Sequence, residues 1–254
     1  MSALVLMSIV LFALMTYVGK WQGVRAFIAF FLNFGALIVL LFFLVNPDVP
    51  IILVTALLVV VVGVINLFFI NGVHEKTKIA FASTLLTALL IFGWITWLNG
   101  MGSIQGFGEE EMDELTIFSL HVGLDFVKIG AAVIVMSTIG AIMDVAISIV
   151  TALYELAKYD RAVTRRELFA SGIRIGRDIL GTDTNTLFFA FFGGYLALLL
   201  WFKALSYTLG ETIHSKVFSA ELVPIFSAGM ALALVIPITT ILTVWRVKKS
   251  DLSS

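Results

Sequence analysis

The fold is decided where Gly176-Arg177-Asp178-Ile179-Leu180-Gly181-Thr182-Asp183-Thr184-Asn185-Thr186 meets Leu187-Phe188-Phe189-Ala190-Phe191-Phe192. The second stretch begins a long apolar run, and the first places two carboxylates, an amide and three hydroxyls directly against it. Because polar groups that face lipid cost free energy, we do not expect such a cluster merely to connect two membrane spans. The junction therefore predicts a polytopic membrane protein with a polar cluster near one membrane face.

The composition of the whole chain points to the same class. Hydrophobic residues make up 60% and charged residues 13% of the chain, whereas a soluble domain carries about 25% charged residues. Cysteine is absent, which excludes disulfides, thiolate metal sites and thiol nucleophiles. The three histidines are far apart and lack the spacing of a helical metal site. We therefore expect no metal, no cofactor and no nucleic-acid partner.

Seven apolar runs are long enough to cross a bilayer, which takes about 20 mostly apolar residues. They are residues 2–19, 26–45, 51–70, 79–98, 126–150, 187–209 and 222–245. The stretch at about 151–186 is too short for a soluble domain and predicts a cytoplasmic amphipathic connector. The predicted fold is all-α, with residues 1–254 forming a single integral membrane domain.

The basic residues predict how these segments are oriented. Thirteen of the sixteen lysines and arginines follow alternate spans: two the first, two the third, six the fifth and three the seventh. The opposite loop at 99–114 is acidic. Since cytoplasmic loops carry the excess of lysine and arginine, we expect the N-terminus outside and the C-terminus in the cytoplasm.

A polar stripe is predicted on the fifth span. Steps of four, three and four residues place one set of polar side chains on a single helical face: Asp144, Ser148, Thr151 and Glu155. An ionisable residue inside a span is a functional candidate by default, so Asp144 is expected to line an ion or substrate path. The alternative interpretation is structural, with Asp144 paired to an arginine of the connector such as Arg174 or Arg177.

The connector predicts a helix that begins at Thr164, where Glu167 completes a capping box. Its apolar and arginine-rich faces are typical of a helix lying along the inner membrane surface. If the helix continues through Gly181, then Asp178, Thr182, Asn185 and Thr186 share a face. If it breaks there, residues 182–186 surround the start of the sixth span. Either form makes a site for an ion or a polar group, and the alternative is that residues 182–185 simply cap the sixth span.

Taken together, these patterns predict ion- or substrate-binding residues on two segments. They are Asp144, Ser148, Asp178, Thr182, Thr184 and Asn185.

Three stretches of the chain also resemble the YibE/F family of bacterial multi-pass membrane proteins. They are Gly140-Ala141-Ile142-Met143-Asp144-Val145-Ala146-Ile147-Ser148, then Ala152-Leu153-Tyr154-Glu155-Leu156, then Gly176 to Leu187. The resemblance implies the multi-pass fold, and the short type of family member that can occur beside a longer relative. Asp183 stands where the family pattern implies an apolar or small residue.

Three functions compete at this stage. The first is a permease or transporter subunit for an ion or small polar solute. The second is a non-transporting assembly partner, in which small residues such as Gly140, Gly193 and Gly194 pack against a related multi-pass protein or a second copy. An intramembrane hydrolase using Asp144 and Asp178 is disfavoured because no protease motif surrounds them, so we expect no enzyme activity.

Overall fold

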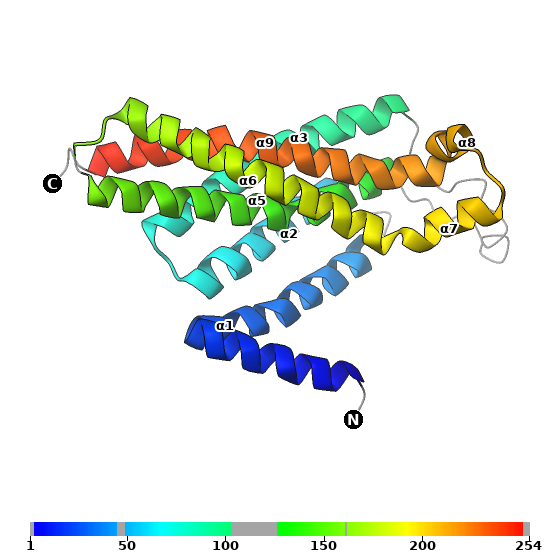
Figure 1. The fold of residues 1–254 in the computed structure, drawn as a ribbon, viewed down its shortest axis with the longest axis horizontal. Helices are drawn as coiled ribbons and strands as arrows, with labels where there is room; N and C mark the ends of the chain where they lie inside the picture. Colours follow the sequence, from blue (N-terminus) through cyan, green and yellow to red (C-terminus); the bar gives the residue numbers. More distant parts are fainter. Residues whose placement is uncertain (1–2, 45–48, 103–125, 161, 251–254) are drawn as a thin grey trace.

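Every element that the structure describes is a helix. The computed structural model describes residues 3–44, 49–102, 126–160 and 162–250, so most of the predicted acidic loop lies outside the described residues. The helices are α1 (Ala3–Leu44), α2 (Ile51–Gly63), the π-helix η1 (Val64–Phe69), α3 (Glu75–Gly102), α5 (Phe126–Tyr159), α6 (Arg165–Gly194), α7 (Leu196–Ala204), α8 (Leu209–His214) and α9 (Lys216–Ser250). Figure 1 shows the long helices α3, α5, α6 and α9 lying lengthwise along one another.

Helix α1 contains two arms that fold back on each other. The break is at Lys20, whose φ of 49° and ψ of −130° are not helical. The Phe12 and Phe27 rings, one on each arm, have centroids 4.9 Å apart. Gly23 meets the Met15 carbonyl so closely that a side chain would not fit there. The two predicted segments 2–19 and 26–45 therefore form a helical hairpin within one element.

The described residues contain five helices long and apolar enough to cross a membrane, or six if α6 and α7 form one broken span. The prediction of seven differs from this for two reasons. Its first two segments are both within α1. Its sixth, residues 187–209, is divided, because α6 ends at Gly194 and α7 continues after a bend of 50°.

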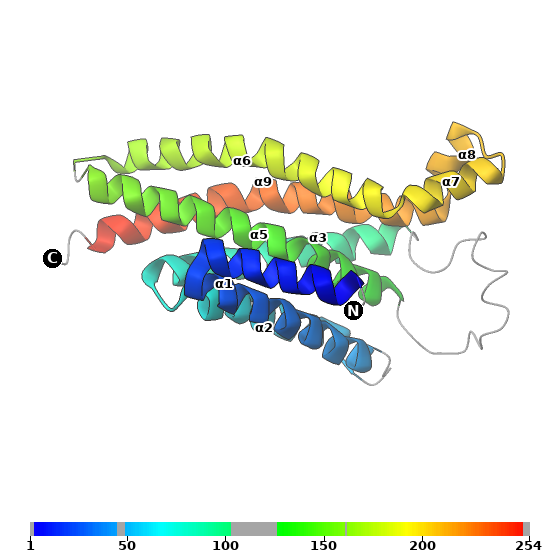
Figure 2. The same ribbon diagram turned by 60° about the horizontal axis from the view of Figure 1, so that its bottom comes forward.

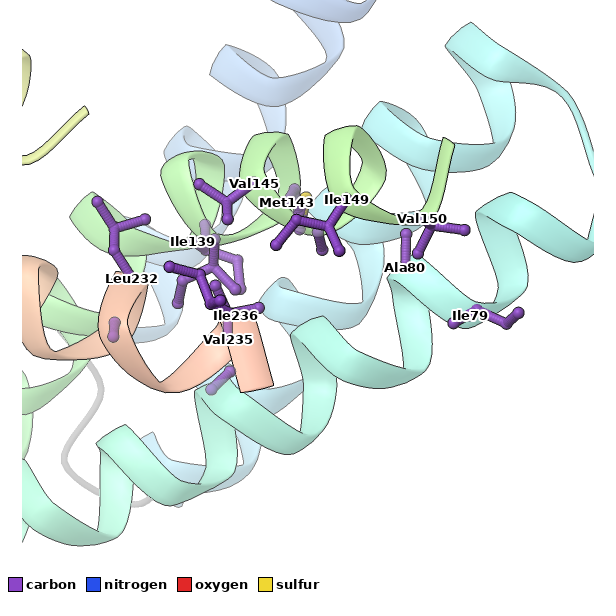
Figure 3. Packing of buried hydrophobic residues seen from close by; sticks show 14 of the residues in the cluster. Ile79, Ala80, Ile139, Met143, Val145, Ile149, Val150, Leu232, Val235 and Ile236 are labelled. Atoms are coloured by element: carbon purple, nitrogen blue, oxygen red, sulfur yellow. The ribbon is translucent and has the colours of Figure 1, made fainter. Parts of the chain in front are cut away.

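The apolar core lies where α3, α5 and α9 meet. Figure 3 shows side chains that build it: Ile79 and Ala80 from α3, Ile139, Met143, Val145, Ile149 and Val150 from α5, and Leu232, Val235 and Ile236 from α9. On α5 the buried positions recur every three or four residues on the face opposite Asp144. Because lipid is as apolar as these side chains, close packing rather than exclusion of water holds the three helices together.

Helix α6 is continuous and packs against α9 through two glycines. The predicted capping box is confirmed, since the Thr164 backbone N–H donates to Glu167 Oε2 at 2.8 Å and the Glu167 N–H donates to Thr164 Oγ1 at 3.3 Å. A Cβ at Gly172 would lie 2.5 Å from Thr240 Cγ2, and one at Gly176 would overlap Ile236. Helix α6 therefore runs lengthwise along α9, whereas the sequence predicted a connector lying along the membrane surface.

The basic links gather at one end of the bundle, as Figures 1 and 2 both show for the turn in α1, the η1–α3 link, the α5–α6 link and the end of α9. Polar contacts join these elements. Lys76 Nζ lies 2.6 Å from Glu155 Oε1, and Arg246 donates to Glu75 Oε2 at 3.0 Å. We call this the basic end of the bundle. The predicted alternation of basic loops is thus present in the fold.

Helix α8 has a capping box that predicts a pH dependence. The backbone N–H and the hydroxyl of Thr208 both donate to Glu211 Oε2 at 2.7 Å. These bonds, the backbone one first, favour the carboxylate and lower the pKa of Glu211 below its ordinary value. The box therefore stabilises α8 above the ordinary glutamate pKa, and this contribution is lost as the pH falls through the lowered pKa.

Carbon-13 NMR of labelled glutamate in detergent micelles is expected to show this low Glu211 pKa. Thr208→Ala removes the hydroxyl donor but keeps the backbone donor, so the pKa should rise part of the way to its ordinary value. Thr212→Ala is the control, because its hydroxyl donates to the Thr208 carbonyl instead. An unchanged Glu211 pKa in Thr208→Ala would contradict the capping box.

Candidate functional site

A cavity of about 320 Å³ lies between α5 and the first half of the fold. Most of its lining is aliphatic and comes from α1, α2 and α5. Four side chains supply the polar part of the lining: Asn33 from α1, Asn66 from η1, and Ser137 and Asp144 from α5. Gly140 lies between the two polar positions of α5 and leaves that wall open, since nothing lies within 4 Å of where its Cβ would be.

The two asparagine side chains are hydrogen-bonded to each other in the cavity wall. Asn33 Nδ2 donates to Asn66 Oδ1 at 3.0 Å, and Asn66 Nδ2 is 3.4 Å from Asn33 Oδ1. Asn66 Nδ2 also donates to the Val62 carbonyl at 2.8 Å, one turn back along the chain. Single-turn π-helices are frequent at functional sites, and here the π-helix places an amide opposite another helix in an otherwise apolar wall.

Asp144 lies far from the basic end of the bundle. It precedes Glu155 by eleven residues on one continuous helix, which places it about 16 Å from the basic end. A bilayer core is about 30 Å thick, so this position is near its middle if the basic end marks one surface. The Asp144 carboxylate also lies within electrostatic range of Asp183 on α6. The fold thus brings together two carboxylates that are 39 positions apart in the chain.

The described part of the chain contains no ion pair between Asp144 and an arginine, which was the structural alternative for this residue. The ion pairs there join Lys76 to Glu155 and both Lys78 and Arg246 to Glu75, and none includes Asp144. The arginines proposed as partners, Arg174 and Arg177, are exposed. They project from other faces of α6 than Asp183, which lies nine positions beyond Arg174 and six beyond Arg177.

The other sequence-predicted residues do not converge on the cavity. Ser148 lies one turn closer to the basic end on the exposed face of α5. Asp178, Thr182 and Asn185 lie inside α6, which runs unbroken through Gly181, so the interpretation that they cap a sixth span is wrong. They are exposed on the outer face of α6. Thr184 is partly buried against Gly229 of α9, and its methyl group would lie 3.6 Å from a Cβ there.

The sequence analysis missed the two asparagines and the proximity of Asp183 to Asp144. Asn33 and Asn66 are single polar residues within apolar runs, and such residues are rare inside membrane segments. That rarity was the available signal, although nothing in the sequence pairs these two residues. The departure of Asp183 from the family pattern was visible in the sequence, but its proximity to Asp144 depends on how α6 packs.

Among the described residues, five or six helices long and apolar enough to cross a membrane define a polytopic helical membrane protein. The chain belongs to the YibE/F-like protein family, whose family model matches residues 7–249. That match includes α1, α2 and η1, which together supply half of the residues that line the cavity. Neither the curated proteins nor the solved structures contain a match to the chain.

Proposed function

We propose that this protein is a permease, or the membrane subunit of one, for a cation or a small polar solute in the bacterial cytoplasmic membrane. The two arms of α1 cross the membrane separately, and α6 with α7 crosses as one broken span. The N-terminus is then outside and the C-terminus cytoplasmic. The support for this topology is the gathering of lysines and arginines at one end of the bundle.

The observation that carries the proposal is the cavity at Asp144. Placing a carboxylate at membrane depth is costly, and structural carboxylates there are normally paired with a base. Asp144 instead opens into a space of about 320 Å³ that also exposes two amides and a hydroxyl. A second carboxylate, Asp183, adds negative potential at the same place. Carboxylate and amide oxygens are the groups that bind hard cations, so the site suits a cation or proton better than an anion.

In this mechanism Asp144 is the group whose charge changes during transport. Binding of a cation or a proton neutralises it and removes the repulsion with Asp183, which favours a different spacing of α5 and α6. The Asn33–Asn66 pair forms the opposite wall and offers amide oxygens to a bound solute. Asp144 binds rather than catalyses, so the proposal includes no chemical reaction.

The test is ion and proton flux in proteoliposomes containing the whole chain. A pH-sensitive dye and a panel of monovalent and divalent cations would be used on the wild type and on Asp144→Asn. The substitution keeps the size and polarity of the side chain but cannot ionise, so flux is expected to be abolished. Asp160→Asn is the matched control, because Asp160 is exposed in the α5–α6 link at the basic end.

Equal flux in wild type and Asp144→Asn would remove Asp144 from the transport path. If neither protein supports flux of any cation tested, the permease proposal fails for this chain alone. Loss of flux in Asp160→Asn as well would show a general effect of surface charge rather than a site.

A further inference from the structure

The outer face of α6 carries a regular seam of residues that are exposed in the described part of the chain. Arg174, Asp178, Gly181 and Asn185 follow one another by four, three and four residues, and all four are exposed. This spacing is the heptad pattern by which one helix packs along another. Nothing lies within 4 Å of where a Gly181 Cβ would be, so the seam has room for a close neighbour. We call these four residues the α6 seam.

The contacts that the opposite face of α6 makes with α9 show at which level of the candidate membrane span the seam lies. Gly172 meets Thr240, Gly176 meets Ile236 and Thr184 meets Gly229, so α6 and α9 are antiparallel neighbours over several turns. All three α9 positions lie inside the candidate span Leu222–Val247. The α6 seam is therefore level with membrane-embedded residues of α9.

In an isolated chain the α6 seam would place a guanidinium, a carboxylate and an amide against lipid. Charged and amide side chains are costly to place against lipid, so these groups are found facing protein or water. Gly176 and Asp183 share one side of α6, because they are seven residues apart, and the glycines on that side pack against α9. The seam is on the other side and is exposed among the described residues, so the surface of a second molecule can cover it.

We propose that a second copy of this chain covers the α6 seam, with the two α6 helices packed in parallel about a twofold axis along the membrane normal. The charges favour this occupant, because the seam holds one cation and one anion a turn apart and is therefore electrically self-complementary. Arg174 of each copy meets Asp178 of the other. Asn185 faces its own counterpart, which is how a single asparagine fixes the register of paired helices, and Gly181 permits the close approach.

Cysteine crosslinking tests this directly, because the natural chain contains no cysteine. Gly181→Cys and Asn185→Cys would be expressed singly in the full chain and oxidised mildly in native membranes. Both are expected to give a covalent dimer as the main species. Leu89→Cys is the matched control, since Leu89 is 65% exposed on α3 in another part of the surface and should give little dimer.

Coexpression of two differently tagged copies identifies the partner. An adduct containing both tags supports the proposal. An adduct of one tag with a different protein overturns it and assigns the seam to another subunit. Absence of any adduct at both seam positions also overturns it, provided that both variants are present in the membrane. Rapid labelling of the unoxidised Asn185→Cys variant by a membrane-impermeant maleimide overturns it as well, because the seam would then line water.

Discussion

Replacing Gly176 with leucine is expected to destabilise the protein by roughly 3 kcal/mol or more, which is at the upper end of overpacking effects. A Cβ at Gly176 would overlap the Cγ2 of Ile236 and would lie 3.0 Å from its Cγ1 and 3.1 Å from its Cβ. Ile236 is β-branched and 5% exposed, so it has no free rotamer into which to retreat. Leucine therefore forces α6 away from α9.

Tryptophan fluorescence during thermal unfolding in detergent would measure the loss as a lower melting temperature. Gly93→Leu is the matched control, because Gly93 is also inside a long helix but nothing lies within 4 Å of where its Cβ would be. Leucine is a better helix former than glycine, so the control should be unchanged or slightly more stable. A Gly176→Leu protein as stable as this control would show that α6 does not pack on α9 in this way.

The helical periodicity of α5 was predictable because it depends only on local sequence. Small and polar residues at Ser137, Gly140, Asp144 and Ser148 alternate with buried aliphatic residues at three- and four-residue steps, and this pattern fixes which face meets the core. The start of α6 was predictable for the same reason, since Thr164 and Glu167 form their bonds within four residues. Local rules therefore placed Asp144 on a polar face correctly.

The course of α6 was not predictable from hydropathy. Its first thirteen residues carry four arginines and a glutamate, which is typical of a surface helix. The helix nevertheless packs lengthwise along α9. The signal for that packing is the small-xxx-small pair Gly172 and Gly176, which allows helices to approach closely. A GxxxG pattern, however, does not identify the helix against which it packs.

The cavity depends on contacts between distant parts of the chain. Asn33 and Asn66 are 33 positions apart, and they meet because α1 folds back at Lys20 and η1 turns one amide toward it. The reversal was predicted, since residues 2–19 and 26–45 were expected to be separate spans, but a π-helix has no strong sequence signature. The predicted site therefore included Asp144 but lacked the wall that faces it.

Substitutions of Asn33 and Asn66 should distinguish what the pair contributes to the stability of the protein from what it contributes to transport. Asn66→Leu alone is expected to destabilise the protein by about 1–3 kcal/mol, because it leaves the Asn33 amide unpaired in an apolar wall. It also frees the Val62 carbonyl, to which Asn66 Nδ2 donates at 2.8 Å. Asn33→Leu should cost less, since Asn66 keeps that second bond.

The double variant Asn33→Leu with Asn66→Leu leaves neither amide unpaired, so its stability should recover toward that of the wild type. Its flux in proteoliposomes should nevertheless stay lost, because the cavity keeps its shape but no longer offers amide oxygens to a solute beside Asp144. Thermal unfolding of the four proteins in a double-mutant cycle measures the coupling, and flux measured in parallel gives the functional readout. A double variant that is stable and still transports would confine the asparagines to a structural role, leaving Asp144 and Asp183 as the polar groups on which solute binding depends.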